Sequence, residues 1–338
     1  MGFGNRGVVH IYRGDAAASS RIQMQLGWCG GYVIDAKVAG FLKRVVDALF
    51  GTERVLVFHG QSTLPYLILA ILFRFVFRRE WRIVYDMHDL NEPPLKRSVR
   101  AVLRYRLFYF FEYLVSRLGI QVITVAKGLA RIFFLRFGVS PQVVYNVAFE
   151  VDRDRGRGSD GLVVDDRAGV VYFGLIKPDR IPLEWVSEVF RAQKDGAFDV
   201  YGRVPKGDFA AYSTELERLA SQTSLRLCGP YKPDAMGFLE KYRYSWLCFE
   251  SDRLNIRYCM PNKLFQSLSA GLCCVISDRL VEARTLFGDA CVSYRDFLRI
   301  CAGELESPAD KIDWKDVEAR MQKVAERSRA VFLEVCSA

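Results

Sequence analysis

The sequence predicts an α/β protein made of two doubly wound domains, each with a parallel sheet covered by helices on both faces. Three observations predict this fold. Short runs rich in Val and Ile alternate with longer segments of helical periodicity. The short runs are apolar throughout, which is typical of parallel strands buried on both faces. The alternation is interrupted once, and 338 residues are enough for two cores.

The first half of the chain carries five of the expected strands and four helices. We expect strands at 8–12, 54–59, 82–87, 121–126 and 142–147, and helices at 35–50, 63–79, 96–118 and 127–137. The stretch "GFGNRG" at 2–7 has the glycine spacing of a dinucleotide-binding loop. It precedes the first strand and opens no helix, so it does not indicate a dinucleotide site.

A charged, Gly-rich stretch separates the two halves. Residues 148–168 break the alternation, and we predict a linker at 151–168 between an N-terminal domain (1–150) and a C-terminal domain (169–310). The second domain has strands expected at 170–176, 198–202, 225–229, 245–250 and 273–277, and residues 311–338 form a closing helix. Because ligands of such sheets bind at the carboxyl ends of the strands, we expect the two domains to face a cleft.

The charge of the chain is unevenly distributed. Residues 1–150 contain 20 Lys and Arg against 10 Asp and Glu, whereas the rest contains 28 against 29, so nearly all of the net charge of +9 lies in the first half. A basic half indicates an anionic partner, either a membrane surface, a phosphate-bearing substrate or nucleic acid. No zinc-finger spacing or ribonucleoprotein motif is found, which argues against nucleic acid.

Cysteine and histidine usage argues against a metal centre. The nine Cys include no Cys-x-x-Cys pair, and the three His show no ligand spacing. Buried, reduced thiols in a cytoplasmic protein are the simpler interpretation. The longest apolar run, 64–77, is too short to cross a bilayer and contains Arg74.

Three turns at carboxyl strand ends combine glycine with cations. Gly174 is followed by Lys177 and Arg180, and Gly202 is followed directly by Arg203. Glycine allows close approach of a ligand to the backbone, and the cations would attract a phosphate.

The third turn, "MPNKLFQSLSAGLCCVIS" at 260–277, opens a short helix. We expect Asn262 as its N-cap after Pro261, with Lys263 beside the free N–H groups and Leu264 on the buried face. A helix start with an adjacent cation suits a diphosphate. A plain capped helix packed on a strand is the alternative.

These motifs resemble one enzyme family. Tyr172-Phe173-Gly174, Tyr201-Gly202, "LCGPY" at 227–231 and the run from Pro261 to Ile276 are similar to the nucleotide-sugar half of GT-B glycosyltransferases, especially the family-four group of bacterial polysaccharide and glycolipid enzymes. "RIVYDMHDLNEP" at 82–93 resembles the strand and His-Asp-Leu loop of the other half. The resemblance covers roughly residues 50–300 and implies two Rossmann-like domains.

The resemblance implies a nucleotide-diphosphate-sugar donor on the second domain, a glycan or lipid-linked acceptor on the first, no metal, and most often retention of configuration. Donor binding maps to Gly174, Lys177, Arg180, Gly202, Arg203, Pro261, Asn262, Lys263, Leu264 and Gln266. Two positions depart from the family pattern, because Gln266 and Tyr258 replace its usual Glu residues. A non-catalytic nucleotide-sugar-binding homologue, an epimerase and a phosphorylase therefore stay open as alternatives.

Two further features belong to the first domain. His88 and Asp89 follow the strand at 82–87, where they can contact the sugar or acceptor, with Asp89 as a general base. On the helix at 96–118, Arg97, Arg100 and Arg104 form a basic face beside an apolar stripe. The stripe either faces the core or, with the arginines, rests on the anionic inner face of the cell membrane.

Overall fold

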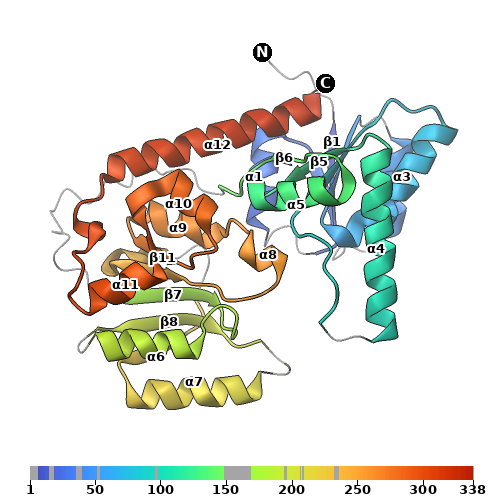
Figure 1. Ribbon diagram of the computed structural model, residues 1–338. Helices are drawn as coiled ribbons and strands as arrows, with labels where there is room; N and C mark the ends of the chain where they lie inside the picture. Colours follow the sequence, from blue (N-terminus) through green and yellow to red (C-terminus); the bar gives the residue numbers. More distant parts are fainter. Residues whose placement is uncertain are drawn as a thin grey trace. The chain divides into compact units, whose positions relative to one another are not determined.

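A computed structural model of the chain describes residues 7–14, 19–35, 40–51, 54–95, 98–147, 169–193, 196–205, 207, 209–231 and 236–337. The chain divides into two compact units (Figure 1). Unit 1 comprises residues 1–148 and 323–338, and unit 2 comprises residues 149–322. The predicted linker at 151–168 lies outside the described residues, so the predicted domain limits stay predictions.

Unit 1 contains a six-stranded sheet in the order β2-β1-β3-β4-β5-β6, with every pair parallel. Its strands are β1 (Val8–Tyr12), β2 (Tyr32–Asp35), β3 (Val55–His59), β4 (Arg82–Met87), β5 (Gln121–Thr124) and β6 (Gln142–Val143). Its helices are α1 (Ser20–Cys29), α2 (Phe41–Phe50), α3 (Leu64–Val76), α4 (Val99–Arg117) and α5 (Lys127–Phe137), with a short 3-10 turn, η1 (Gln61–Thr63).

The faces of this sheet are covered by different helices. Val57 and Val84 lie on the face that packs against Phe332 and Val335, from the end of α12 (Trp314–Ser337). Trp28 of α1 packs on the same core. Helices α2, α3 and α4 contact one another in series, as right-handed crossovers between successive strands require. The face bearing α1 and α12 is the one that carries the polar site described below.

Unit 2 has a second parallel six-stranded sheet, in the order β12-β11-β10-β7-β8-β9. Its strands are β7 (Val170–Leu175), β8 (Phe198–Arg203), β9 (Leu225–Gly229), β10 (Tyr244–Leu247), β11 (Cys273–Ile276) and β12 (Cys291–Ser293). The helices are α6 (Leu183–Ala192), α7 (Ala210–Gln222), α8 (Leu254–Arg257), α9 (Asn262–Ser269), α10 (Val281–Phe287), α11 (Tyr294–Cys301) and the first part of α12, up to Gln322, with 3-10 turns η3 (Met236–Lys241), η4 (Gly288–Ala290) and η5 (Pro308–Asp310). Trp246, Phe198 and Phe265 are fully buried in its core.

The two parallel sheets confirm the predicted fold class. The main error lies near the amino terminus, where neither α1 nor β2 was predicted, whereas the predicted helix at 35–50 is present as α2 over Phe41–Phe50. Helix α1 is rich in polar residues and lacks a strong apolar stripe, so periodicity does not reveal it. Strand β6 has two residues, against six predicted. Among the described residues, no helix is both long and apolar enough to cross a membrane.

Candidate functional site

Asp86 is the centre of a buried polar cluster in unit 1. It lies on β4 directly opposite His59 of β3, and both side chains are fully buried. Arg21 of α1 donates from Nε and Nη2 to the two carboxylate oxygens at 2.6–3.0 Å, and Gln25 Nε2 donates to Oδ2 at 2.9 Å. Burial alone would raise the pKa of Asp86, but Arg21 and the neighbouring histidines outweigh it and hold the pKa well below its usual range. Asp86 is therefore a carboxylate at neutral pH.

The ionised carboxylate fixes the tautomers of two buried histidines. His59 Nδ1 lies 3.0 Å from Asp86 Oδ2 and must donate, because the carboxylate can only accept. His59 Nε2 then accepts from His10 Nδ1 at 2.9 Å. Burial lowers the pKa of both rings, that of His10 to about 3, so both are neutral at pH 7. The hydrogen bonds thus run in one direction, from His10 through His59 to Asp86.

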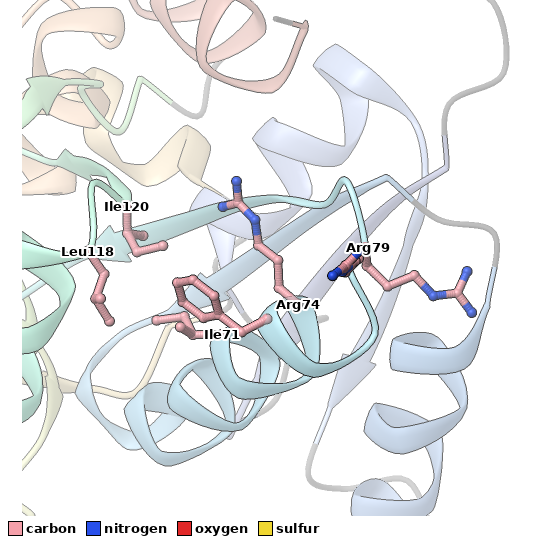
Figure 2. Close-up of a pocket in the computed structure, with 7 residues that line it drawn as sticks. Ile71, Arg74, Arg79, Leu118 and Ile120 are labelled. Carbon is pink, nitrogen blue, oxygen red and sulfur yellow. The ribbon is translucent and has the colours of Figure 1, made fainter.

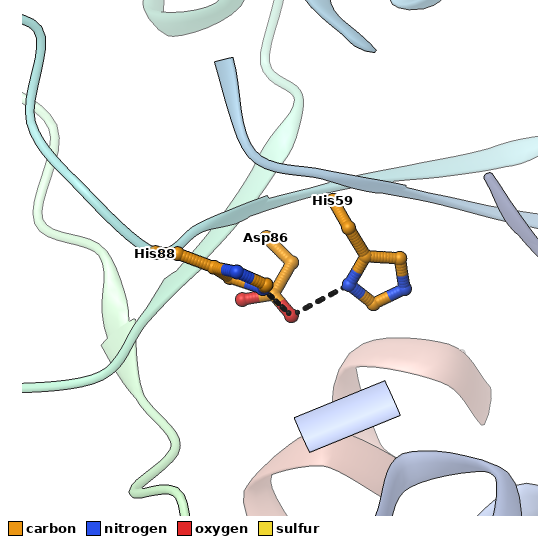
Figure 3. Close-up of side chains that lie close together, drawn as sticks. All are labelled: His59, Asp86 and His88. Carbon is orange, nitrogen blue, oxygen red and sulfur yellow. Dashed lines mark hydrogen bonds and ion pairs between the residues drawn. The ribbon is translucent and has the colours of Figure 1, made fainter. Parts of the chain in front are cut away.

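His88 is the solvent-facing member of the cluster (Figure 3). Its Nε2 lies 3.3 Å from Asp86 Oδ2, and its side chain is 25% exposed. Because the carboxylate can only accept, Nε2 donates to it and Nδ1 is the second ring nitrogen of His88. Asp89 lies on the surface one residue later, where its backbone carbonyl accepts a hydrogen bond from Gln61 Nε2 at 3.2 Å. Both residues predicted to be catalytic are therefore within reach of a solute.

His59, Asp86 and His88 also have the atoms of a metal site, since their ligand atoms lie within 4.8 Å of one another. The electrostatics argue against a resident cation. Arg21 binds both oxygens of Asp86, and a divalent ion there would face a buried guanidinium. The cluster is explained as a charge-compensated hydrogen-bond network instead.

The loop after His88 is attached to α4 and α5. Asn91 Nδ2 donates to the carbonyl of Tyr105 at 2.8 Å, and Arg136 Nη1 donates to the carbonyl of Asn91 at 2.7 Å. Glu112 of α4 is fully buried nearby. Burial raises its pKa to about 8 against the opposing effect of Arg136. Glu112 is thus mainly protonated at neutral pH, beneath the loop that presents His88 and Asp89.

In unit 2, two predicted glycines meet at neighbouring strand ends. Gly174 of β7 pairs with Gly202 of β8, and both have positive φ, of 135° and 152°. A Cβ at Gly202 would lie 1.8 Å from the carbonyl oxygen of Gly174. A Cβ at Gly174 would lie 2.3 Å from Cε and 2.4 Å from Nζ of Lys263. Glycine is therefore required at both positions. The contact between Gly174 and Lys263 places the Lys263 ammonium against β7.

Lys263 and Arg180 form a pair of cations without a carboxylate. Burial and the nearby Arg180 lower the pKa of Lys263 to about 8. The Arg180 guanidinium lies 4.3 Å above the Phe249 ring, and Lys263 Nζ lies 6.0 Å from the centre of the Tyr172 ring. In the part of the chain that the structure describes, no acidic side chain forms an ion pair with either cation. An anion would relieve this repulsion, which makes the site suited to phosphate.

The helix after Pro261 departs from its predicted capping. Pro261, not Asn262, is the N-cap, and Asn262 is the first helical residue of α9. The predicted N-cap was wrong because Pro261 already supplies the extended backbone that a cap requires. Leu264 and Phe265 are buried as expected, and Gly271 has the left-handed φ of 70° expected after a helix.

The remaining predicted residues are dispersed. In unit 2, Lys177 and Gln266 are half-buried, whereas Arg203 and Tyr258 are exposed. On α4, Arg100 and Arg104 are exposed, and Arg104 lies 5.3 Å above the Phe108 ring. Arg97 lies outside the described residues. The structure thus brings Gly174, Gly202, Lys263 and Arg180 together, while the roles of all these residues stay predictions.

Sequence reasoning missed the residues that hold Asp86. His10 was given no role, and Arg21 and Gln25 lie on the helix that was not predicted. A signal was present, because Arg21, Gln25 and Cys29 are spaced four residues apart and so share one helical face. Cys29 Sγ lies 3.6 Å from His10 Nε2, at the end of the same network.

Comparison with solved structures shows that this arrangement of two parallel sheets and their helices occurs in known proteins. HepE of Anabaena, in complex with UDP, matches with a TM-score of 0.62 at 13% identity, over 98% of this chain and 95% of HepE. The chain has the GT-B fold. Sucrose-phosphate synthase from Thermosynechococcus elongatus matches with a TM-score of 0.67 at 10% identity, over 98% of both chains. A glycosyltransferase from Rickettsia africae matches with a TM-score of 0.67 at 8% identity, over 99% of this chain and 100% of that one. No protein-family model and no curated protein matches the sequence.

The buried Glu112 gives a prediction about pH. The pKa of Glu112 in the folded state, about 8, is above the ordinary value of 4.5. Its contribution to the free energy of unfolding is therefore fully present below about pH 4.5 and is lost as the pH rises to about 8. Glu112→Gln keeps the shape and removes the titration. Between pH 5 and 8 we expect the parent to lose about 3 kcal/mol of unfolding free energy relative to this variant. Urea denaturation at several pH values measures the difference.

The matched control is Glu334→Gln, which changes an exposed carboxyl on α12 of the same unit. Its pH dependence should follow that of the parent. A Glu112→Gln protein with the parent's slope would show that Glu112 is ionised in the folded state.

Proposed function

We propose that this protein is a glycosyltransferase that moves a sugar from a nucleotide-diphosphate sugar to a glycan or lipid-linked acceptor. The observation that carries the proposal is the pair of cations, Lys263 and Arg180, beside Gly174 in a GT-B fold. HepE of Anabaena has been solved with UDP and with UDP-glucose, which supports a uridine nucleotide as the donor class.

The diphosphate would bind at the amino-terminal end of α9. The start of a helix carries a partial positive charge that attracts an anion, and the Lys263 side chain adds a full charge there. Gly174 lets Lys263 lie against β7, Gly202 lets the carbonyl of Gly174 approach it closely, and Arg203 and Lys177 follow the same strand ends. As the sugar leaves, negative charge grows on the diphosphate, so the same cations stabilise the transition state.

The acceptor would be handled by unit 1. His88 is held by Asp86 through Nε2, so its other ring nitrogen is the one available for a hydrogen bond or for proton transfer. Asp89 offers an exposed carboxylate beside it. We place the reaction at the cytoplasmic face of the cell membrane, in surface polysaccharide or glycolipid synthesis. We expect retention of configuration, following the resembled group, and the anomeric proton coupling of the product tests this.

Lys263 is the first test of the donor site. Lys263→Met keeps most of the side-chain volume and should leave the protein at least as stable as the parent, because the ammonium lies in an unfavourable place when no anion is bound. UDP binding should weaken about 10- to 100-fold, the size of a charged hydrogen bond. At pH 8, where the terminal phosphate of UDP is already ionised, the parent should also take up about half a proton more than Lys263→Met on binding, since phosphate restores the pKa of Lys263.

Titration calorimetry in buffers of different ionisation enthalpy measures both affinity and proton uptake. Lys311→Met removes an exposed lysine from unit 2 and serves as the control. If Lys263→Met binds UDP with the parent's affinity and proton uptake, the diphosphate site lies elsewhere.

A second prediction concerns metal. The proposal assigns neutralisation of the leaving diphosphate to Lys263, Arg180 and the start of α9, so no divalent cation is needed. Transfer should continue at the parent rate in excess EDTA. Loss of activity that magnesium restores would contradict this assignment.

The third prediction separates the roles of His88 and Asp89. His88→Ala should lower the transfer rate by about 10²- to 10⁴-fold, the usual contribution of a general acid or base. Its UDP affinity should not change, because the donor nucleotide is assigned to unit 2. Asp89→Asn is measured beside it, and the variant with the larger loss identifies the base. Parent rates in both variants would remove these residues from the mechanism.

A protein that binds nucleotide sugar without turnover is the second candidate. It is favoured by Gln266 and Tyr258, which stand where the resembled group usually carries Glu. A thermal-shift panel of nucleotide sugars identifies the best donor. Slow hydrolysis of that donor by the parent, absent in Lys263→Met, supports the enzyme, whereas binding without hydrolysis or transfer supports the second candidate.

A further inference from the structure

Exposed apolar side chains are concentrated on unit 1. Among the described residues, 21 large apolar side chains are exposed, and only five of them belong to unit 2: Leu175, Leu227, Tyr258, Val281 and Leu305. The other 16 lie in unit 1, the same half that carries nearly all of the net positive charge. A large exposed apolar surface on a soluble domain marks an interaction site.

Helix α4 presents an apolar stripe to solvent. Val99, Leu103, Leu107 and Phe110 follow one another at helical spacing, and their side chains are 77%, 62%, 49% and 51% exposed. The sequence left open whether this stripe faces the core. In the structure α4 buries its opposite face instead, with Glu112, Val115 and Ser116 against the domain.

Arginines flank this stripe on both sides. At 100° per residue, Arg100 and Arg104 lie along one edge and Arg106 along the other, and all three are exposed. An apolar stripe flanked by arginines is the pattern of a helix lying in a membrane interface. The side chains of arginine can extend from such a stripe to lipid phosphates.

Helix α3, which contacts α4, continues the same surface. Leu72, Phe75 and Val76 are 55%, 68% and 71% exposed, and Phe77 follows at the end of the helix. Helices α3 and α4 run next to each other on the outer side of unit 1 (Figure 1). We define the α3–α4 face as these side chains together with the stripe of α4 and its flanking arginines.

A cationic cavity of about 330 Å³ opens on this face. It is lined by Arg74, Arg78 and Arg79 from the end of α3, with Ile71, Phe75, Leu118 and Ile120 (Figure 2). Arg78 is the only residue other than glycine with a positive φ, of 48°, in the described part of the chain. Glycine is the usual residue at that position after a helix, because a left-handed backbone strains other residues. Arg78 therefore adopts this conformation at a cost in backbone free energy.

The three arginines of the cavity have no acidic partner among the described residues, since no ion pair involves them. The cavity is large enough for a phosphate headgroup and has apolar walls for the glycerol next to it. The positive charge of the cavity favours an anionic ligand. The apolar residues around the cavity favour a surface that has an apolar layer beneath its anionic groups. An anionic bilayer meets both conditions.

We propose that the α3–α4 face docks on an anionic phospholipid bilayer, with the stripe of α4 entering the interface and Arg74, Arg78 and Arg79 binding a lipid phosphate. A second copy of the chain fits less well, because two such faces would bring their arginines together. The inference rests on the membrane location given in the proposed function and names the surface that provides it, but docking itself does not depend on sugar transfer.

Vesicle sedimentation of the full chain tests the docking. We expect binding to vesicles of phosphatidylcholine with 30% phosphatidylglycerol at least about tenfold tighter than to phosphatidylcholine alone, and weaker binding as salt rises. Removing the cavity charges with Arg74→Gln, Arg78→Gly and Arg79→Gln together should weaken binding about 100-fold, or about fivefold for each arginine. Glycine at position 78 also suits the left-handed backbone, so the fold is preserved.

The apolar stripe is tested separately. Leu103→Ser with Leu107→Ser should weaken vesicle binding about 30- to 100-fold without unfolding the protein, because both side chains are exposed. Leu107→Trp places a reporter in the stripe, and its fluorescence should shift to shorter wavelength on the anionic vesicles. Leu135→Ser and Leu135→Trp, at a 72% exposed position on α5 of the same unit, are the matched controls.

A matched charge control removes three other exposed arginines, Arg131, Arg279 and Arg295, by change to glutamine. It should alter binding by less than about twofold. Equal binding of the parent to both kinds of vesicle, or equal losses in the test and control variants, would overturn the proposal. So would a dimer in light scattering that the Leu103→Ser and Leu107→Ser changes abolish while no vesicle binding is seen. Because sugar transfer is not read out, failure here leaves the proposed function unaffected.

Discussion

The ion pair between Asp86 and Arg21 is the constraint on which the polar site of unit 1 depends. Both side chains are almost fully buried, and burying two charges is favourable only when each is completely hydrogen-bonded. Arg21 meets this condition by donating also to the carbonyl of Val144 at 2.7 Å, beyond the end of β6. One guanidinium therefore joins α1, β4 and the segment after β6, elements separated by more than 100 residues in the chain.

The same pair determines the chemistry of the histidines. Because Arg21 keeps Asp86 ionised, His59 and His88 both donate to it. The second nitrogen of the buried, neutral His59 ring accepts from His10, whereas His88 is partly exposed. A ring whose tautomer and orientation are fixed before the substrate arrives needs no reorganisation in the reaction, which is the advantage of preorganised groups.

The fold was predictable because buried parallel strands give an unambiguous signal, and so were the glycine and lysine positions of unit 2. The sequence did not reveal how these groups meet. It gave no sign that Lys263 lies against Gly174, since that contact depends on how α9 packs on the sheet, next to β10 and β11. It also left the orientation of α4 open, because that helix is apolar on both faces and only tertiary packing decides which is buried. Helix α1, weakly periodic, was missed together with Arg21 and Gln25.

The two polar sites differ in how their charge is compensated, and this difference indicates different roles. In unit 1 the carboxylate of Asp86 is matched by Arg21 and three further donors from the protein itself, so the cluster gains nothing from an added ion. In unit 2 Lys263 and Arg180 repel each other, and burial lowers the pKa of the lysine. A site that its own chain leaves uncompensated is stabilised by a ligand of opposite charge. The first arrangement suits the orientation of groups for chemistry, and the second suits the reversible binding of an anion, as we propose.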